Sequence, residues 1–234
     1  MTDSRARILG RIRDSLERTG SMLATEADVY PPPHPHGPFV ATDLDVVEQF
    51  RAELTGLRAY VHICDGPAEA LEQVCALLET VQAQQVLTWA EEELPLPNLL
   101  PTLAAMGITS VERQVLATDD RQGRFDLLES VPVCISGVDA AIAESGTMLV
   151  VSGAGRPRLA SLLPPMHIAL LPVERIVRTM PDAFEVLNAH FSASLFQDRS
   201  NLTMITGPSR TADIELSLTL GVHGPREVHA IVIR

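Results

Sequence analysis

Short apolar segments alternate with helical segments from Asp43 onward, and this alternation constrains the fold more than any other feature of the chain. The spacing of apolar residues predicts helices at Val46–Leu57 and Pro67–Val81, and short buried strands at Tyr60–Cys64 and Gln85–Trp89. Parallel strands need a crossover connection, which is usually a helix, so a regular alternation of this kind is typical of βαβ units. The sequence therefore predicts an α/β fold with a mostly parallel sheet.

The alternation continues to the end of the chain. It passes through Leu99–Met106 and Ser110–Val115, and the remaining expected elements are strands at Val131–Ile135, Thr147–Ser152, His167–Pro172, Leu202–Thr206 and Val228–Ile233, and a helix at Pro181–Asn188. The chain has 234 residues, of which 46% are apolar, enough for one packed core. We expect a single large domain with an N-terminal appendage.

The appendage covers residues 1–38. Ile8, Ile12 and Leu16 recur at helical spacing, and the stretch Tyr30–Pro38 holds five prolines in nine residues, which excludes a helix or a central strand there. We expect a helix and a proline-rich linker at 1–38, followed by the α/β domain at 39–234. The helix either packs on its own domain or grips a partner subunit.

Charge and cysteine usage exclude several classes of function. The net charge is −12, which argues against nucleic-acid binding, and the 18 basic residues are all arginine, so any anion is bound by arginine and backbone N–H groups. Three widely spaced cysteines exclude a cysteine-ligated iron–sulfur cluster, and no metal or other cofactor is expected. Without a secretory signal or an apolar run of membrane-spanning length, we expect a cytoplasmic protein.

The first loop with candidate chemistry is ISGVDAAIAESGT, residues 135–147. Loops that follow strands are the first candidates for functional residues, because ligands of open α/β sheets bind outside the carboxyl ends of strands. Asp139 and Glu144 are candidates for general base or nucleophile. The alternative is that Asp139 caps a turn and Glu144 pairs with an arginine.

The second loop, VVSGAGRPRLASLLPP, contains Gly153, Gly155, Arg156 and Arg158. Glycines let the backbone approach a ligand closely, and guanidinium groups match carboxylate or phosphate, so these four residues are candidate anion-binding residues. The loop leads to His167, which is a candidate acid or base near neutral pH or else a hydrogen-bonded structural residue.

The third loop, GPSRT at residues 207–211, is a candidate anion-binding turn. Gly207, Ser209, Arg210 and Thr211 offer backbone N–H groups, hydroxyls and a guanidinium, and a helix starting after Thr211 would direct its positive end at an anion. Apolar residues after Asp213 alternate with a period of two, so that segment is either helical or extended. We expect Arg156, Arg158 and this turn to converge on one anion pocket.

Three of these segments, AAIAESGT, SLLPPMHIALLP and GPSRTADIELSLTLGVHGP, resemble the signature segments of the LUD-domain family, specifically its lactate-utilisation protein C group. The likeness covers about the last hundred residues strongly and the rest by layout. It implies a three-layer α/β/α fold like that of ribose-phosphate isomerases and CoA-transferases. It also implies a part in oxidising L-lactate to pyruvate with two partner proteins, one of which bears iron–sulfur clusters.

Two classes of function remain open at this stage. In the first, the chain is a ligand-binding or accessory subunit of a lactate-oxidising assembly. In the second, it is an enzyme that acts on an anionic small molecule such as a sugar phosphate, a CoA ester or a folate. Glu144-Ser145-Gly146 resembles the placement of the CoA-transferase nucleophile, which favours the second class, whereas the sequence offers no complete redox-cofactor motif, which favours the first.

Overall fold

The structure is a computed structural model that describes residues 7–15, 17, 44–111, 120–191, 199–211 and 219–234. The chain forms two compact units, Met1–Asp43 and Leu44–Arg234. In the first unit, residues 7–15 and 17 are helical, and Ile8, Leu9 and Ile12 are exposed. Leu16 and the proline-rich stretch lie outside the described residues, so the expected boundary at residue 38 stays a prediction.

The centre of the second unit is a six-stranded sheet in which every pair of neighbouring strands is parallel. Its strand order is β1-β12-β7-β4-β2-β3, with the bounds β1 Tyr60–Cys64, β2 Gln85–Thr88, β3 Thr109–Ser110, β4 Val133–Gly137, β7 Met166–Pro172 and β12 Glu227–Ile233. All residues of β4 and β7 are buried, as expected for strands covered on both faces. The predicted α/β fold with a mostly parallel sheet is confirmed.

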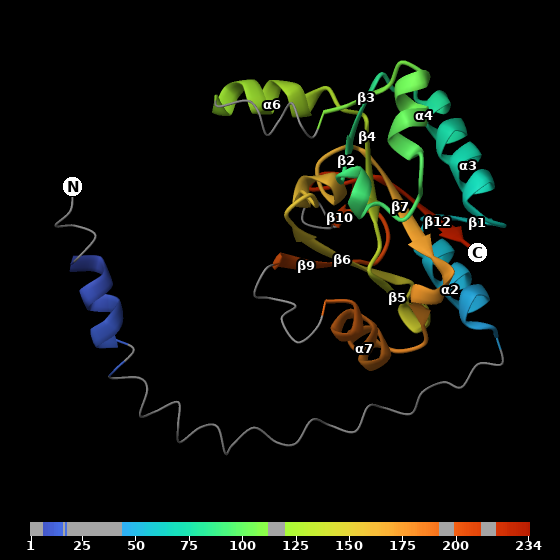
Figure 1. Cartoon of the computed structure of the whole chain (residues 1–234). Helices are drawn as coiled ribbons and strands as arrows, with labels where there is room; N and C mark the ends of the chain where they lie inside the picture. The colour runs from blue at the N-terminus through green and yellow to red at the C-terminus, as the bar shows by residue number, and fades with distance from the viewer. Residues whose placement is uncertain (1–6, 16, 18–43, 112–119, 192–198, 212–218) are drawn as a thin grey trace. The chain divides into compact units, whose positions relative to one another are not determined.

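Helices occur in the crossovers from β1 to β2, from β2 to β3 and from β3 to β4, and α3 and α4 lie together along one side of the sheet (Figure 1). The described helices of this unit are α2 Val46–Gly56, α3 Pro67–Thr80, α4 Leu99–Ala105, α6 Arg121–Glu129 and α7 Met180–Phe191. Helix α2 starts where the side chain of Asp45 accepts a hydrogen bond from the N–H of Val47, and α3 starts with Pro67 in its first turn. None of the described helices has the length and apolar character needed to cross a membrane.

A second, four-stranded sheet was not predicted as a separate sheet. Its order is β8-β5-β6-β9, with the bounds β5 Ala140–Ile142, β6 Thr147–Gly153, β8 Ile176–Val177 and β9 Arg199–Ile205. Strand β6 runs antiparallel to both β5 and β9, and α7 packs against β5 around a small core that includes Ile142, Leu149 and Leu187. The sequence predicted β6 and β9 as strands, but their local pattern does not show which sheet they join.

A short antiparallel ribbon joins β10 Arg210–Thr211 to β11 Thr219–Leu220. Arg210 and Thr211 are therefore extended. The segment between the two strands, residues 212–218, lies outside the described residues, so its conformation stays a prediction.

The order of the central strands places a topological switch point between β2 and β4. The chain leaves β2 toward β3 at one edge of the sheet and leaves β4 toward β7 in the opposite direction. At such a switch point, neighbouring strands send their connections apart, and ligands of open α/β sheets bind just beyond the carboxyl ends of those strands. The residues that follow Thr88 and Gly137 are therefore the first place to look for a site.

Candidate functional site

An arginine cluster occupies the predicted position beyond the carboxyl ends of β2 and β4. Trp89 follows β2 directly and leads into a short helix, η1 (Glu91–Glu93), while Asp139 lies two residues after β4. Arg156 reaches both segments from a turn after β6. The cluster thus combines three segments that are far apart in sequence at the switch point of the sheet.

Arg156 is the centre of this cluster and is almost fully buried. Its Nε donates to Oε2 of Glu93 at 2.5 Å, and its Nη1 donates to Oδ1 of Asp139 at 2.7 Å. The guanidinium carbon lies 4.6 Å from the ring centre of Trp89 and 5.4 Å from that of Phe191. Two carboxylates and two aromatic faces therefore fix its position, a geometry that suits arginine rather than lysine.

Asp139 accepts hydrogen bonds from Arg156 and from the backbone of β6. Its side chain is completely buried, Oδ1 accepts from Arg156, and Oδ2 accepts from the backbone N–H of Val151 at 2.7 Å. Both oxygens of the carboxylate are thus engaged. This arrangement supports the interpretation that Asp139 is a positioning residue.

Gly153 and Gly155 of the second predicted loop form the turn that carries Arg156. Gly153 and Arg156 exchange two backbone hydrogen bonds of 3.1 and 3.0 Å, which makes a tight turn. Gly155 has a φ of +69°, its carbonyl accepts from the N–H of Ala90, and an added Cβ would lie 3.3 Å from both Ala90 and Glu93. The close approach that glycine permits here is therefore to the chain's own η1 segment.

A cavity of about 280 Å³ opens beside this cluster, and its lining is rich in cations. Its described lining residues are Glu92, Glu93, Leu94, Pro95, Arg156, Arg175, His190, Phe191 and Arg199. Arg175 comes from η4 (Val173–Arg175), which follows β7 directly, and its Nη1 donates to the carbonyl oxygen of Val138 at 2.7 Å. Arg199 begins β9, and its guanidinium lies 5.0 Å from the ring centre of Phe191.

Three guanidinium groups and the carboxylates of Glu92 and Glu93 line this cavity. Glu93 and Asp139 offset the charge of Arg156, whereas the hydrogen bond that Arg175 makes to Val138 is to a neutral carbonyl. Burial lowers the pKa of His190, and the positive charges of Arg175, Arg156 and Arg199 lower it further, although Asp139 opposes them. Three of the four charges that act on this imidazole are thus positive, in a chain whose net charge is −12.

Glu144 lies apart from this cluster, on the short helix η2 (Ala143–Ser145) between β5 and β6. It is partly exposed, and its Oε1 accepts from the N–H of Met180, the first residue of α7, at 3.4 Å. Gly146 ends η2 with a φ of +60°, and an added Cβ would lie 2.6 Å from the backbone nitrogen of Leu54 in α2. The glycine thus permits close packing of α2 on this turn.

The other predicted residues do not join Arg156. His167 lies at the amino end of β7, where it lines a second cavity together with Gly207 and Ser209. Arg158 and Arg210 are exposed, in η3 (Arg158–Ser161) and β10 respectively, and Thr211 follows in β10. Arg156 lines the arginine cavity, whereas Gly207 and Ser209 line the second cavity together with Ser161 and Leu162 from the second loop.

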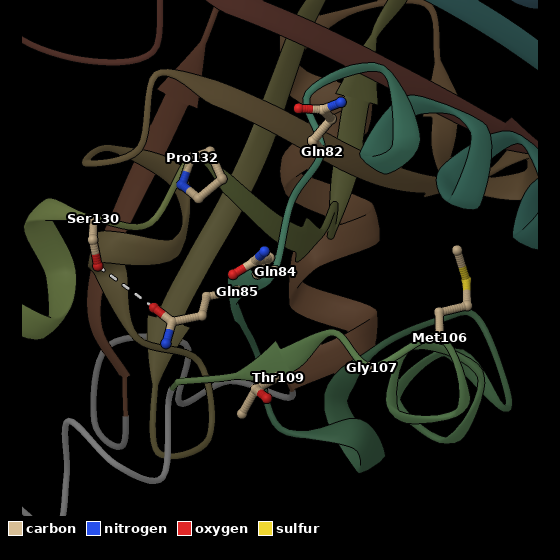
Figure 2. A pocket seen from close by; sticks show the side chains of 8 residues that line it. All are labelled: Gln82, Gln84, Gln85, Met106, Gly107, Thr109, Ser130 and Pro132. Atoms are coloured by element: carbon tan, nitrogen blue, oxygen red, sulfur yellow. Dashed lines mark hydrogen bonds between the residues drawn. The ribbon is translucent and has the colours of Figure 1, made fainter.

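A cavity of about 720 Å³ lies at the amino ends of β2, β3 and β4 (Figure 2). Its described lining residues are Gln82, Gln84, Gln85, Met106, Gly107, Thr109, Ser130 and Pro132, none of which carries a formal charge. Figure 2 shows the side chains of Gln85 and Ser130 directed at each other, and Ser130 Oγ donates to Gln85 Oε1 at 3.5 Å. This open polar groove offers neither a charged group nor a proton carrier for chemistry.

Sequence reasoning missed Arg175, His190 and Arg199. Arg175 follows the carboxyl end of β7, so the rule that selected the other loops also applies to it. His190 and Arg199 lie at the end of α7 and the start of β9, and only the packing of the second sheet brings them to the cavity. No local pattern distinguishes them from other surface residues.

Comparison with known proteins places this fold in a family. The model of the LUD domain matches residues 47–233, which is most of the chain. The chain belongs to the LUD-domain family. The family match thus covers the central sheet, the second sheet and the arginine cavity.

Curated relatives of this LUD-domain chain carry the name lactate utilization protein C. The relative from Halalkalibacterium halodurans is 34% identical and covers 70% of each chain, and that from Exiguobacterium sp. is 28% identical over 94% of each chain. A crystal structure of a DUF162 family protein from Deinococcus radiodurans matches with a TM-score of 0.56 and 21% identity, covering 81% of this chain and 96% of that one. This structural likeness shows the fold.

Proposed function

We propose that this LUD-domain chain is a ligand-binding subunit of a lactate-utilisation system, and that its arginine cavity binds the carboxylate of L-lactate or pyruvate. In this proposal the chain takes part in the oxidation of L-lactate to pyruvate together with partner proteins, one of which bears iron–sulfur clusters. The name shared by its relatives supports the metabolic role. The cavity supports the ligand-binding role.

The observation that carries the proposal is the meeting of three guanidinium groups in one cavity. Arg156 is held rigidly by Glu93 and Asp139, so it offers a fixed surface rather than a mobile side chain. Arg175 and Arg199 approach from η4 and β9 and add positive charge. Guanidinium groups in such a setting form charge-assisted hydrogen bonds with carboxylates, which are among the strongest in proteins.

The size of the cavity favours a small ligand. Binding sites for drug-sized molecules usually enclose about 300–1,000 Å³, and this cavity of about 280 Å³ lies just below that range. A three-carbon hydroxy acid or keto acid fits such a volume, whereas a whole CoA ester or folate does not. The geometry therefore favours lactate or pyruvate over the larger anions.

Calorimetric titration of the full chain with L-lactate and with pyruvate tests the proposal. Arg199→Gln should weaken binding roughly ten- to hundred-fold, because a hydrogen bond to a charged group contributes about 1.5–3 kcal/mol. Arg234→Gln is the matched control, since Arg234 forms an exposed ion pair with Asp65 and is not among the residues that line the cavity. Equal loss in both variants, or no binding of either acid, would contradict the assignment.

The alternative of an enzyme with its own activity rests on Glu144. Its carboxylate is partly exposed on η2, beside the positive end of α7, where it could act as a base or nucleophile. Turnover of sugar phosphates or CoA esters by the isolated chain, lost in Glu144→Gln, would favour this alternative. Lactate-dependent growth restored by the wild-type chain, with no turnover by the isolated protein, favours the accessory subunit.

A further inference from the structure

A second cavity lies at the amino ends of β7 and β12, at the other end of the central strands from the arginine cavity. It encloses about 330 Å³. Its walls come from η3, β7, β9 and the segments that flank the β10–β11 ribbon, and they combine hydroxyl groups, apolar side chains and two imidazoles. The described lining residues are Ser161, Leu162, His167, Thr203, Met204, Ile205, Thr206, Gly207, Pro208, Ser209, His223, Gly224, Pro225 and Val228.

His167 is the residue of this cavity that indicates a bound ligand. The residue is completely buried, and its Nε2 lies 2.9 Å from Oγ of Ser136 in β4, which fixes the ring. Its Nδ1 is buried and makes no hydrogen bond with any residue that the structure describes. Buried polar atoms are nearly always satisfied, and His167 lines the cavity, so we infer that a ligand in the cavity is the partner of this nitrogen.

The charge state of His167 restricts what can fill that position. Burial, together with the nearby His229, lowers the pKa of His167 to about 4, so the imidazole is neutral at physiological pH. A neutral imidazole has one donor and one acceptor nitrogen, and the bond to Ser136 is compatible with either tautomer. A ligand hydroxyl both donates and accepts, so it satisfies Nδ1 in both cases.

The rest of the lining also fits an uncharged ligand. Ser161, Thr206 and Ser209 contribute hydroxyl groups, and Leu162 and Val228 contribute apolar surface. Neither a guanidinium nor a carboxylate is among the described lining residues, in contrast to the arginine cavity. An anion here would lose its hydration without gaining a counter-charge, which disfavours lactate, pyruvate and phosphate esters.

We propose that this second cavity is a binding site for an uncharged molecule of nucleoside size, with a flat heteroaromatic ring and hydroxyl groups, one of which bonds Nδ1 of His167. The site is distinct from the arginine cavity and does not depend on the function proposed for it. The ring would lie against Leu162 and Val228, and the remaining hydroxyls would face Ser161 and Ser209. The Gly207 turn forms one wall of the site rather than a phosphate cradle.

Two substitutions of His167 separate ligand binding from structural support. The side-chain nitrogen of glutamine can reach the place of Nε2, so His167→Gln keeps a partner for Ser136 and removes the group at Nδ1. Asparagine places its amide near Nδ1, so His167→Asn keeps that group and gives up the bond to Ser136. We expect His167→Gln to lose binding and His167→Asn to retain most of it.

A blocking variant keeps the test valid if the core substitutions do not fold. Met204 is 42% exposed and lines the cavity, so Met204→Trp should narrow it without removing a hydrogen bond. Met106 is 39% exposed and lines the open groove at the amino ends of β2 and β3 instead. Met106→Trp is therefore the matched control.

The experiment is a titration of the full chain, labelled with ¹⁵N-histidine, with adenosine as the probe and AMP as its charged counterpart. Adenosine should shift the Nδ1 resonance of His167, and its affinity should fall at least ten-fold in Met204→Trp and in His167→Gln but not in Met106→Trp. Absence of a shift with adenosine, an unchanged affinity in Met204→Trp, or a response to AMP alone would overturn the proposal. A lactate titration followed on His190 reports separately on the arginine cavity, so failure at one site is not mistaken for failure at the other.

Discussion

Replacing Arg156 by methionine should destabilise the protein more than any other single substitution of a charged residue in the arginine cluster. Methionine keeps an apolar chain against Trp89, so the change chiefly removes the positive charge. The charge of Asp139 then remains in a position where its side chain has no exposed surface. Leaving one partner of a buried ion pair without the other usually costs about 3–5 kcal/mol.

The structure places the expected value near the lower end of that range. Asp139 keeps the hydrogen bond from the N–H of Val151, which continues to stabilise its carboxylate. We therefore expect the free energy of unfolding to fall by about 3 kcal/mol, which lowers the melting temperature of a domain of this size by about 6–12 °C. Glu93 is 27% exposed, so water compensates part of its loss, and Glu93→Gln should cost less than about 1 kcal/mol.

Urea denaturation of four proteins measures this coupling directly: the wild type, Arg156→Met, Asp139→Asn and the double variant. Because the double variant leaves no buried carboxylate unpaired, its loss should be smaller than the sum of the single losses by about 2 kcal/mol. Additive losses, or a loss below about 1 kcal/mol in Arg156→Met, would show that the pair does not hold the two loops together.

Three further outcomes are expected. A bound carboxylate should offset the cations around His190 and raise the lowered pKa of that imidazole, so ligand binding takes up a proton. L-lactate should therefore bind more tightly at pH 5.5 than at pH 7.5, and this pH dependence should disappear in His190→Gln. Gly146→Ala should lower the free energy of unfolding, measured by urea denaturation, by more than about 2 kcal/mol, because its Cβ would lie 2.6 Å from the backbone nitrogen of Leu54 at a positive φ. Gly56→Ala is the control: an added Cβ there meets no atom within 4 Å, so the change should be neutral or slightly stabilising. Glu144→Gln should assemble and melt like the wild type, and full growth of the complemented strain on L-lactate would eliminate Glu144 as a catalytic residue.

The central sheet could be predicted from the sequence because its strands are buried between helices. Tyr60–Cys64 is a strand with the predicted bounds, and the helices on either side of it have strong apolar spacing. The second sheet could not be predicted in the same way. Strands β5 and β8 are three and two residues long, too short for any periodic pattern. They pair with each other, and β5 also pairs with β6, so their conformation depends on the neighbouring strands.

The candidate site was predictable only where its residues follow strands. Asp139 and Arg156 were selected for that reason, and the structure joins them. The same rule selected Arg210, but the rule does not say which end of the central sheet a loop occupies when its strand belongs to a second sheet. Strand β9 is such a strand, and the turn after it lies at the amino end of β7.

The pairing of β1 with β12 has a consequence for synthesis on the ribosome. Tyr60 lies opposite His229, so the first strand of the central sheet meets its neighbour only after the intervening residues have been made. At a translation rate of about 5–20 residues per second, β1 remains without its partner strand β12 for roughly 10–30 s. During that interval the nascent chain exposes a strand that other polypeptides can pair with, so we expect it to depend on chaperones that shield such edges.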